Sequence, residues 1–160
     1  MITHERLQYL YRYDRRGWLK RVVNAKKTKY PNGRPIGKGY RGLTIEGRTY
    51  YMHRLVWFYF NGAWPAQIDH KDGNKENNKR GNLRECTTAQ NPHNSPPKRG
   101  SRSGVKGVFP CPDGKWMVLI VVKGKQTYKG RFGTIKEAAA AYNRAARHHF
   151  GKFARLNKDA

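Results

Sequence analysis

Cysteine and acidic residues are scarce in this chain, and long apolar runs are missing. Its 160 residues include only two cysteines, Cys86 and Cys111, and no CxxC pair. A four-ligand zinc site built on cysteine pairs is therefore excluded, and we expect two free, partly buried thiols. The longest apolar runs, over residues 55–60 and 117–122, are far too short to span a bilayer.

The shortage of acidic residues leaves a strongly basic chain. Lysine and arginine number 34 against 10 acidic residues, which gives a formal net charge of +24. Such an excess favours a polyanionic partner, because each neutralised phosphate releases a counterion. An anionic membrane is the other polyanion, but no basic amphipathic helix with an apolar face is evident. The first residues show no signal-peptide pattern, so we expect a reducing, cytoplasmic environment.

Hydrophobic content indicates how the chain is divided. At 37%, it is low for one compact domain of this length and fits two small domains better. Residues 92–103 are rich in proline, glycine, serine and basic side chains, which is typical of a solvated linker. We therefore expect one module over 1–91 and another over 104–160. The linker could be a plain tether or could lie along a phosphate backbone.

Turn residues predict two hairpins in the first module. One spans residues 11–19 with its turn at 14–17, and the other spans 44–50 and turns at Glu46-Gly47. Residues 53–60 are ambiguous. Their aromatic and β-branched content suits a strand, and a short buried helix fits equally well.

The second module has a clearer pattern of strands followed by a helix. Three short strands are expected over residues 105–110, 115–122 and 126–132. Thr134 and Glu137 then form a capping box, and apolar residues follow at helical spacing. Gly151 suits the end of that helix. The alanines on its apolar face predict close packing against the sheet.

One polar stretch carries groups suited to phosphodiester hydrolysis. That reaction needs a base for the attacking water and a cation for the charge on the phosphate. His70 could be the base, and Asp69 and Asn91 offer hard oxygen ligands of the kind that Mg²⁺ or Mn²⁺ prefers. Asn82 could brace the loop over 71–80 and so hold His70 in place. Since adjacent strand residues point to opposite faces, the strand should end or bend at Asp69-His70.

These residues resemble the HNH endonucleases, in the bacteriophage and homing-endonuclease branch with the ββα-metal site. The resemblance rests on residues 53–57, 68–74, 77–78, 82–84 and 88–91. It implies that His70 is the general base, that Asn82 stabilises the loop, and that Asp69 and Asn91 hold one divalent ion. It also implies that His70 lies on a strand, that Asn82 begins a second strand, and that Asn91 lies on a following helix.

The second module resembles the AP2 DNA-binding domain. The matching residues are 104–108, 114–116, 130–134, 137–139, 141–142 and 145–146, within nearly the whole segment 103–157. The resemblance implies a sheet that enters the major groove of DNA. The chain departs from the plant-type pattern at Phe109, Cys111 and Asp113, where that branch presents arginines and a tryptophan.

Basic and aromatic residues in both modules and the linker are the candidates for DNA contact. They are Arg54, Lys98, Arg99, Arg102, Lys106, Lys115, Lys123, Lys125, Tyr128 and Arg131. His53 is expected to have a structural role. His93 lies two residues after the predicted ligand Asn91, and positions two apart do not face the same side of a helix, so His93 is not expected to bind the metal.

The sequence as a whole predicts an α+β protein. We expect an N-terminal ββα-metal module and a C-terminal three-stranded antiparallel sheet with one packed helix. The predicted activity is metal-dependent cleavage of double-stranded DNA by a phage homing-type nuclease, with one Mg²⁺ or Mn²⁺, no structural zinc and no membrane partner. A phage origin would place it in the cytoplasm of a bacterial host. A catalytically inactive AP2-type regulator and an RNA-binding protein remain alternatives, and monomer or homodimer stays open.

Overall fold

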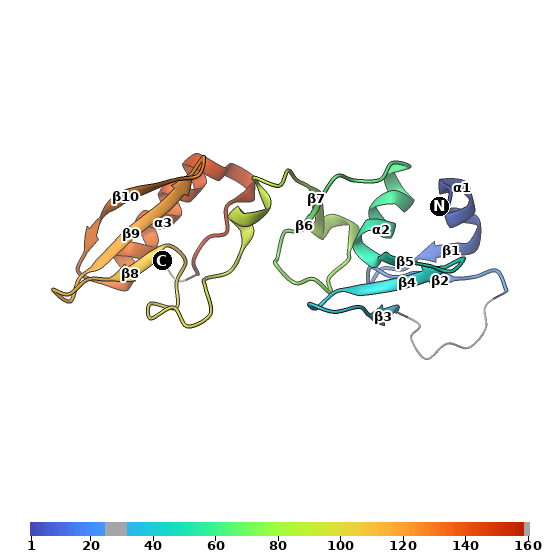
Figure 1. Cartoon of the computed structure of the whole chain (residues 1–160), viewed down its shortest axis with the longest axis horizontal. Coiled ribbons are helices and arrows are strands. Elements are labelled where there is room, and N and C mark those ends of the chain that lie inside the picture. Colours follow the sequence, from blue (N-terminus) through green and yellow to red (C-terminus); the bar gives the residue numbers. More distant parts are fainter. Residues whose placement is uncertain (25–31, 159–160) are drawn as a thin grey trace. The chain divides into compact units, whose positions relative to one another are not determined.

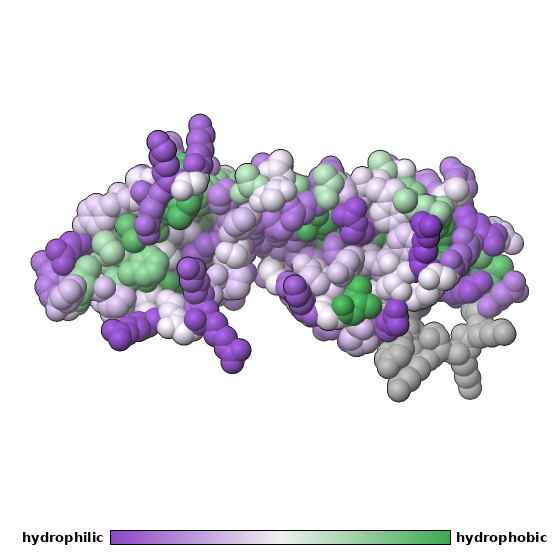
Figure 2. Space-filling view, viewed as in Figure 1, coloured by the Kyte–Doolittle hydropathy of each residue, from purple (hydrophilic) through white to green (hydrophobic). Residues whose placement is uncertain are grey.

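A computed structural model describes residues 1–24 and 32–158 of this chain. The chain divides into two compact units, Met1–Thr87 and Thr88–Ala160. Each combines helices with small antiparallel sheets (Figure 1). Hydrophilic side chains cover much of the visible surface (Figure 2), as the charge predicts. Within the described ranges, no helix has the length and apolar content needed to cross a membrane.

The first unit begins with a helix and two separate antiparallel sheets. In chain order its first elements are α1 (His4–Leu10), β1 (Tyr11–Tyr13), β2 (Leu19–Arg21), β3 (Arg34–Pro35), β4 (Arg41–Ile45) and β5 (Arg48–Tyr51). β1 pairs with β2, and β4 lies between β3 and β5. Both predicted hairpins are confirmed. In the second, Glu46 and Gly47 both adopt positive φ, as a tight hairpin turn requires.

The ambiguous segment 53–60 belongs to a helix, α2 (Met52–Asn61), which ends at the left-handed Gly62. Its buried side chains recur at helical spacing, with Met52, Leu55, Val56 and Phe58 all in the core. A fully buried side chain of this size contributes about 1.5–3 kcal/mol to folding. Burial of this one face therefore outweighs the strand propensity of the aromatic and β-branched residues.

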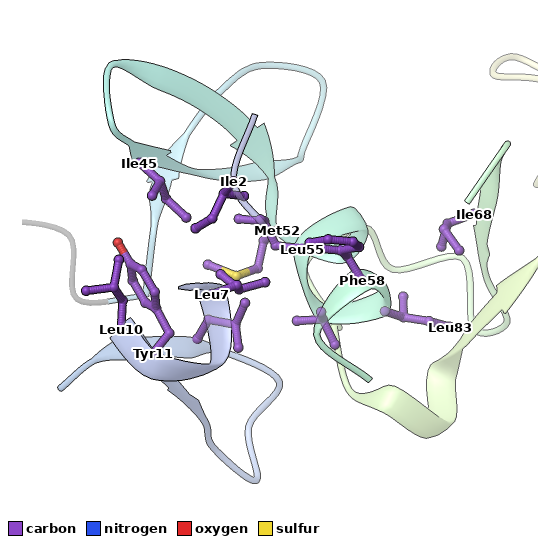
Figure 3. Packing of buried hydrophobic residues seen from close by; sticks show 12 residues of the cluster. Ile2, Leu7, Leu10, Tyr11, Ile45, Met52, Leu55, Phe58, Ile68 and Leu83 are labelled. Atoms are coloured by element: carbon purple, nitrogen blue, oxygen red, sulfur yellow. The ribbon is translucent and has the colours of Figure 1, made fainter. Parts of the chain in front are cut away.

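A two-stranded hairpin packs against α2. It consists of β6 (Ile68–His70) and β7 (Leu83–Glu85), paired antiparallel with Asp69 opposite Arg84 and His70 opposite Leu83. Ile68 and Leu83 join the same core as the α2 residues (Figure 3). β6 ends at His70, which confirms the predicted strand end at that position. A loop and the short 3-10 helix η1 (Arg80–Asn82) then lead into β7.

The second unit is a three-stranded sheet with a long helix on one face. Its elements are η2 (Asn91–Asn94), β8 (Val108–Pro110), β9 (Trp116–Val122), β10 (Lys125–Phe132), α3 (Ile135–Phe150) and η3 (Gly151–Phe153). β9 lies between β8 and β10, and all pairs are antiparallel. Thr134 and Glu137 form the predicted capping box, and α3 ends at Gly151. The predicted three strands and helix are confirmed, with the first strand starting at Val108 instead of residue 105.

Small residues let α3 approach the sheet closely. Ala138, Ala141 and Ala146 are buried against Val118 and Ile120 of β9. Ala138 and Ala146 are fully buried at 0% exposure, so the helix backbone can lie near the strands. The role predicted for the alanines, packing on the sheet, is confirmed.

Gly107 should be indispensable for the second unit. A Cβ there would lie 2.2 Å from the Tyr142 ring and 2.7 Å from the Leu119 carbonyl oxygen, and Tyr142 is itself buried. We expect Gly107→Ala to lower the stability of this unit by about 3 kcal/mol, since left-handed strain and overpacking add. Hydrogen exchange measured by mass spectrometry would report each unit separately.

Gly114→Ala is the matched control for that substitution. Gly114 has φ +77 against +74 for Gly107, but a Cβ at Gly114 would meet nothing within 4 Å. Both variants carry the same backbone strain, and only Gly107→Ala carries the clash. Equal effects of the two substitutions would contradict the packing argument.

Candidate active site

His70 is buried at the end of β6, where an asparagine holds its ring. Its exposed fraction is 4%, and its Nε2 lies 3.2 Å from Oδ1 of Asn78. The Asn78 amide is oriented by its own Nδ2, which donates to the Glu76 carbonyl oxygen at 3.1 Å. An amide oxygen can only accept, so Nε2 carries the proton in this contact. Nδ1 is then the basic nitrogen of the neutral ring.

The surroundings of His70 keep that ring neutral. Burial lowers the pKa of His70, and nearby Lys75 acts in the same direction. The Asn78 hydrogen bond and the carboxylates of Asp72 and Asp69 raise the pKa, but the net shift is downward. A neutral histidine can accept a proton at neutral pH, which is the property that a general base requires.

A second histidine and a tyrosine pack around this ring. The His53 ring lies edge-on to His70, with 5.2 Å between ring centroids, and Tyr40 lies 5.1 Å from His53 and 6.2 Å from His70. Burial lowers the pKa of His53 to about 3, with His70 and Arg54 contributing. His53 is therefore a neutral packing residue, which fits the structural role expected for it.

Asn82 closes the loop between β6 and β7. Its Oδ1 accepts from the Asp72 backbone N–H at 3.1 Å, and its Nδ2 donates to Asp72 Oδ1 at 2.9 Å and to the Asn77 carbonyl oxygen at 2.8 Å. The Asn82 carbonyl also accepts from the Lys71 N–H, one residue after His70. The amide thus spans the loop as the brace hypothesis requires. The ring contact itself comes from Asn78.

Asp69 lies beside His70 and has an arginine partner. Arg84, directly opposite on β7, donates from Nε at 2.7 Å and from Nη2 at 2.5 Å, both to Asp69 Oδ2. The two side chains are only 7% and 12% exposed. This is a buried ion pair between a predicted metal ligand and an arginine for which the sequence predicted no role in the site.

A hard divalent ion fits the chemistry of the donors at this hairpin. Asp69 supplies carboxylate oxygen, the ligand type that Mg²⁺ and Mn²⁺ prefer, and few protein ligands leave positions for water and phosphate oxygens. Among the described residues, no cluster of three or more histidine, cysteine, aspartate or glutamate side chains could hold a metal. Asn91, the other predicted ligand, begins η2 in the second unit.

The charged groups of two residues predicted to contact DNA donate hydrogen bonds to backbone carbonyl oxygens within their own units. Arg54 donates to the carbonyl oxygens of Pro65 and Ala66, at 2.7 and 3.3 Å. The Lys106 ammonium donates to three carbonyl oxygens at 2.7–3.1 Å, those of Pro92, His93 and Ser95. Burial lowers the Lys106 pKa to about 8. These contacts tie backbone segments together, a different role from the phosphate contacts expected for both residues.

The other predicted contacts lie at the surface of the second unit. Lys98, Arg99, Arg102, Lys115, Lys123, Lys125, Tyr128 and Arg131 are all exposed. Arg131 pairs with Asp113 at 2.8 Å, and Tyr128 is 53% exposed on the sheet face that points away from α3. That face also carries Phe109 and Val121, 42% and 53% exposed. Both charged and aromatic groups are thus available to a ligand.

The two cysteines are free thiols, as predicted. Cys86 is buried next to the β6–β7 hairpin, and Cys111 is half-buried in the second unit. Burial raises the pKa of the Cys86 thiol, with Asp69 and Glu85 adding and Arg84 opposing. A thiol held protonated is unreactive, so Cys86 serves packing.

The segment that contains His70, Asn78 and Asn82 is similar to a known protein family. Residues 50–93 match the sequence model described as HNH endonuclease. This segment of the chain is therefore similar to HNH endonucleases. The match covers α2, the β6–β7 hairpin with its loop, and the start of η2.

Two further likenesses involve more of the chain. A relative from Acanthamoeba polyphaga mimivirus, named as an uncharacterized HNH endonuclease, is 31% identical over 126 residues, which cover 77% of this chain. The matched part spans 65% of that relative's length. A solved structure of the HNH homing endonuclease I-HmuI, described as showing DNA binding and cleavage, is 24% identical and matches with a TM-score of 0.40. That match covers 88% of this chain and 77% of the other.

Two residues of the matched segment contact the candidate site and were not predicted to belong to it. Asn78 is buried at 1% exposure and contacts His70, and Arg84 pairs with Asp69. Asn78 looked like one of several loop asparagines. Arg84 is two residues after Asn82, and its pairing depends on hairpin register. Asp69 and Arg84 lie equally far from the loop that joins their strands. Once these two strands are paired, the two side chains are therefore expected to face each other.

Proposed function

We propose that this protein is a metal-dependent endonuclease that hydrolyses phosphodiester bonds of double-stranded DNA, of the phage homing type. The observation that carries the proposal is His70: a buried, neutral imidazole whose Nε2 is held by Asn78, next to a carboxylate, within a segment similar to HNH endonucleases. Burial and an oriented hydrogen bond are how proteins prepare a histidine to take a proton.

His70 would act through Nδ1. In the proposed reaction this nitrogen accepts the proton of the attacking water, and the ring becomes an imidazolium. The carboxylates of Asp69 and Asp72, which already raise the His70 pKa, would stabilise that cation. Asn78 keeps the ring oriented through Nε2, and Asn82 keeps the loop that carries Asn78 and Asp72 in place.

The proposed ligands of the divalent ion are Asp69 and Asn91. Bound there, Mg²⁺ or Mn²⁺ would stabilise charge on the phosphate and its leaving oxygen. Asp69 contributes a buried carboxylate whose position is set by strand pairing. Asn91 contributes a side-chain amide from the first residue of η2.

The second unit is proposed to bind the DNA. The net charge of +24 and the three-stranded sheet with one packed helix, AP2-like in its motifs, support this part of the proposal. The proposed contacts are the exposed residues Lys98, Arg99, Arg102, Lys115, Lys123, Lys125, Tyr128 and Arg131. Arg54 and Lys106 are left out of this set, because internal carbonyl oxygens occupy their charged groups.

Cleavage of supercoiled plasmid DNA tests the proposed function. The purified protein should convert the plasmid to nicked or linear product with Mg²⁺ or Mn²⁺, and chelation by EDTA should stop the reaction. Parallel binding assays with duplex DNA and RNA at one salt concentration separate the alternatives. Binding without cleavage on any DNA would favour the inactive regulator, and preference for RNA would favour the RNA-binding protein.

A further inference from the structure

The Asp69 carboxylate already has a cation against it. Two N–H groups of Arg84 converge on Asp69 Oδ2, at 2.7 and 2.5 Å, from the position directly opposite across the β6–β7 ribbon. With side-chain exposures of 12% and 7%, the pair is shielded from water. A shielded pair interacts far more strongly than a surface one, and removing either partner takes this counter-charge away from the other buried group.

This pairing conflicts with metal binding by the same carboxylate. A divalent ion on Asp69 would place two more positive charges beside the guanidinium, and both cations would share one anion. If Asp69 turns to the ion, Arg84 loses much of its counter-charge. A buried arginine that has lost its carboxylate partner is stabilised by another anion that reaches it.

DNA brings such an anion. Phosphate offers two oxygens that match the planar fork of a guanidinium, which makes arginine a suitable residue for a phosphate held at a dry site. Cleavage requires a phosphate beside the metal ligand and therefore beside the partner of that ligand. An arginine that contributes only general DNA affinity is expected at the surface. Arg84 is instead 12% exposed and paired with Asp69.

We propose that Arg84 is the cation that neutralises Asp69 until a divalent ion binds there. It holds the Asp69 carboxylate in place before an ion binds, and its guanidinium then moves from Asp69 to an oxygen of the scissile phosphate. This rests on the proposed nuclease function for its second step. The first step, competition between Arg84 and a divalent ion for Asp69, requires no DNA.

Mn²⁺ binding in the absence of DNA tests the first step. Free Mn²⁺ is followed by electron paramagnetic resonance during titration of the full chain. Arg84→Met removes the competing cation and should tighten Mn²⁺ binding roughly tenfold, a typical coupling between two sites. Arg84→Lys keeps a positive charge and should bind Mn²⁺ like the wild type. Equal or weaker binding by Arg84→Met, or no binding by either protein, overturns the proposal.

Arg41→Met is the matched control. Arg41 also pairs with a carboxylate, Glu76, at 3.0 Å in the same unit, but these side chains are 29% and 54% exposed. A solvated pair of this kind contributes little, so its loss should leave Mn²⁺ affinity unchanged. A similar gain in affinity in Arg41→Met would show that net charge alone is responsible and would also overturn the proposal.

Thermal unfolding gives a readout that is independent of activity. Without metal, Arg84→Met removes the arginine that neutralises the buried Asp69 charge, so this variant should unfold at a lower temperature than wild type. Added Mn²⁺ should raise its Tm more than it raises the wild-type Tm, because the ion replaces the missing cation. If Arg84→Met does not fold, Arg84→Gln, which still offers Asp69 a hydrogen-bond donor, takes its place with the same expectations.

Single-turnover cleavage at saturating Mn²⁺ tests the second step. Arg84→Met should cut about 10²–10³-fold more slowly than wild type despite its tighter Mn²⁺ binding, as expected for a lost phosphate donor. A wild-type rate at saturating Mn²⁺ overturns the transfer of Arg84 to the phosphate. A wild-type protein that cuts no DNA defeats the proposed function, and the Mn²⁺ and melting results still decide the first step.

Discussion

His70→Ala should abolish DNA cleavage and leave DNA binding nearly intact. The substitution removes the imidazole Nδ1 that would take the proton from water, and general-base catalysis accounts for about 10²–10⁴-fold in rate. The side chain is buried among Asn78, His53 and Tyr40 and is not part of the proposed DNA-binding surface. Single-turnover plasmid cleavage with Mn²⁺ and gel-shift titration of the same preparation would measure the two effects.

His148→Ala is the control for this substitution. His148 is an exposed histidine near the end of α3, where its ring contacts that of His149. Its loss should change neither cleavage nor folding. Cleavage by His70→Ala at more than about a tenth of the wild-type rate would rule out His70 as the base.

The pH dependence of cleavage should also show that the base is a buried, neutral histidine. Since burial lowers the His70 pKa, the ring is still neutral at a pH where an exposed histidine, with a pKa of about 6.5, is half protonated. The acid limb of the single-turnover rate should therefore lie below pH 6.5, with activity lost as pH falls through the lowered pKa. An acid limb above that value would contradict the neutral, buried base.

Asn82→Ala should reduce cleavage about 10²-fold without removing any group that touches the water or the phosphate. The amide makes three hydrogen bonds across the loop, two to Asp72 and one to Asn77. Each such bond contributes about 0.5–1.5 kcal/mol, so their joint loss frees the loop that positions Asn78 against His70. Single-turnover rates should fall while Mn²⁺ affinity and DNA affinity stay close to wild type.

Asn74→Ala is the matched control within that loop. The Asn74 side chain accepts one local bond, from the Glu76 N–H at 3.0 Å, and spans no distance across the loop. Its replacement should lower the rate by less than about threefold, which corresponds to one exposed hydrogen bond. Equal losses in Asn74→Ala and Asn82→Ala would show that any change in the loop is harmful and that Asn82 has no special bracing role.

Local patterns in the sequence were enough to predict most elements. Turn residues placed both N-terminal hairpins, and the capping box of Thr134 and Glu137 placed the start of α3. Those signals act over a few residues, so tertiary contacts seldom override them. The segment 53–60 could not be decided in this way, because its residues suit both states and the choice depends on which face the rest of the unit buries.

Residue types and spacing indicated a site for phosphodiester chemistry, with His70, Asp69 and Asn82 as its candidate members. Their neighbours depended on the fold. Arg84 reaches Asp69 through strand register, and Asn78 reaches His70 because the loop folds back, so neither contact is written in a local pattern. The same holds for Arg54 and Lys106, whose charge suggested phosphate and whose surroundings supply carbonyl oxygens.

The sequence by itself thus determined the basic charge and most of the local elements, and it indicated two units and the candidate groups for cutting a phosphodiester. Only the tertiary structure decided which of these groups are buried, which nitrogen of His70 is the basic one, and which cation neutralises Asp69. The physical reason is that charge is a property of single residues, and secondary-structure propensity is a property of short segments. Burial, hydrogen-bond partners and pKa shifts belong to pairs of residues that the fold brings together from distant positions.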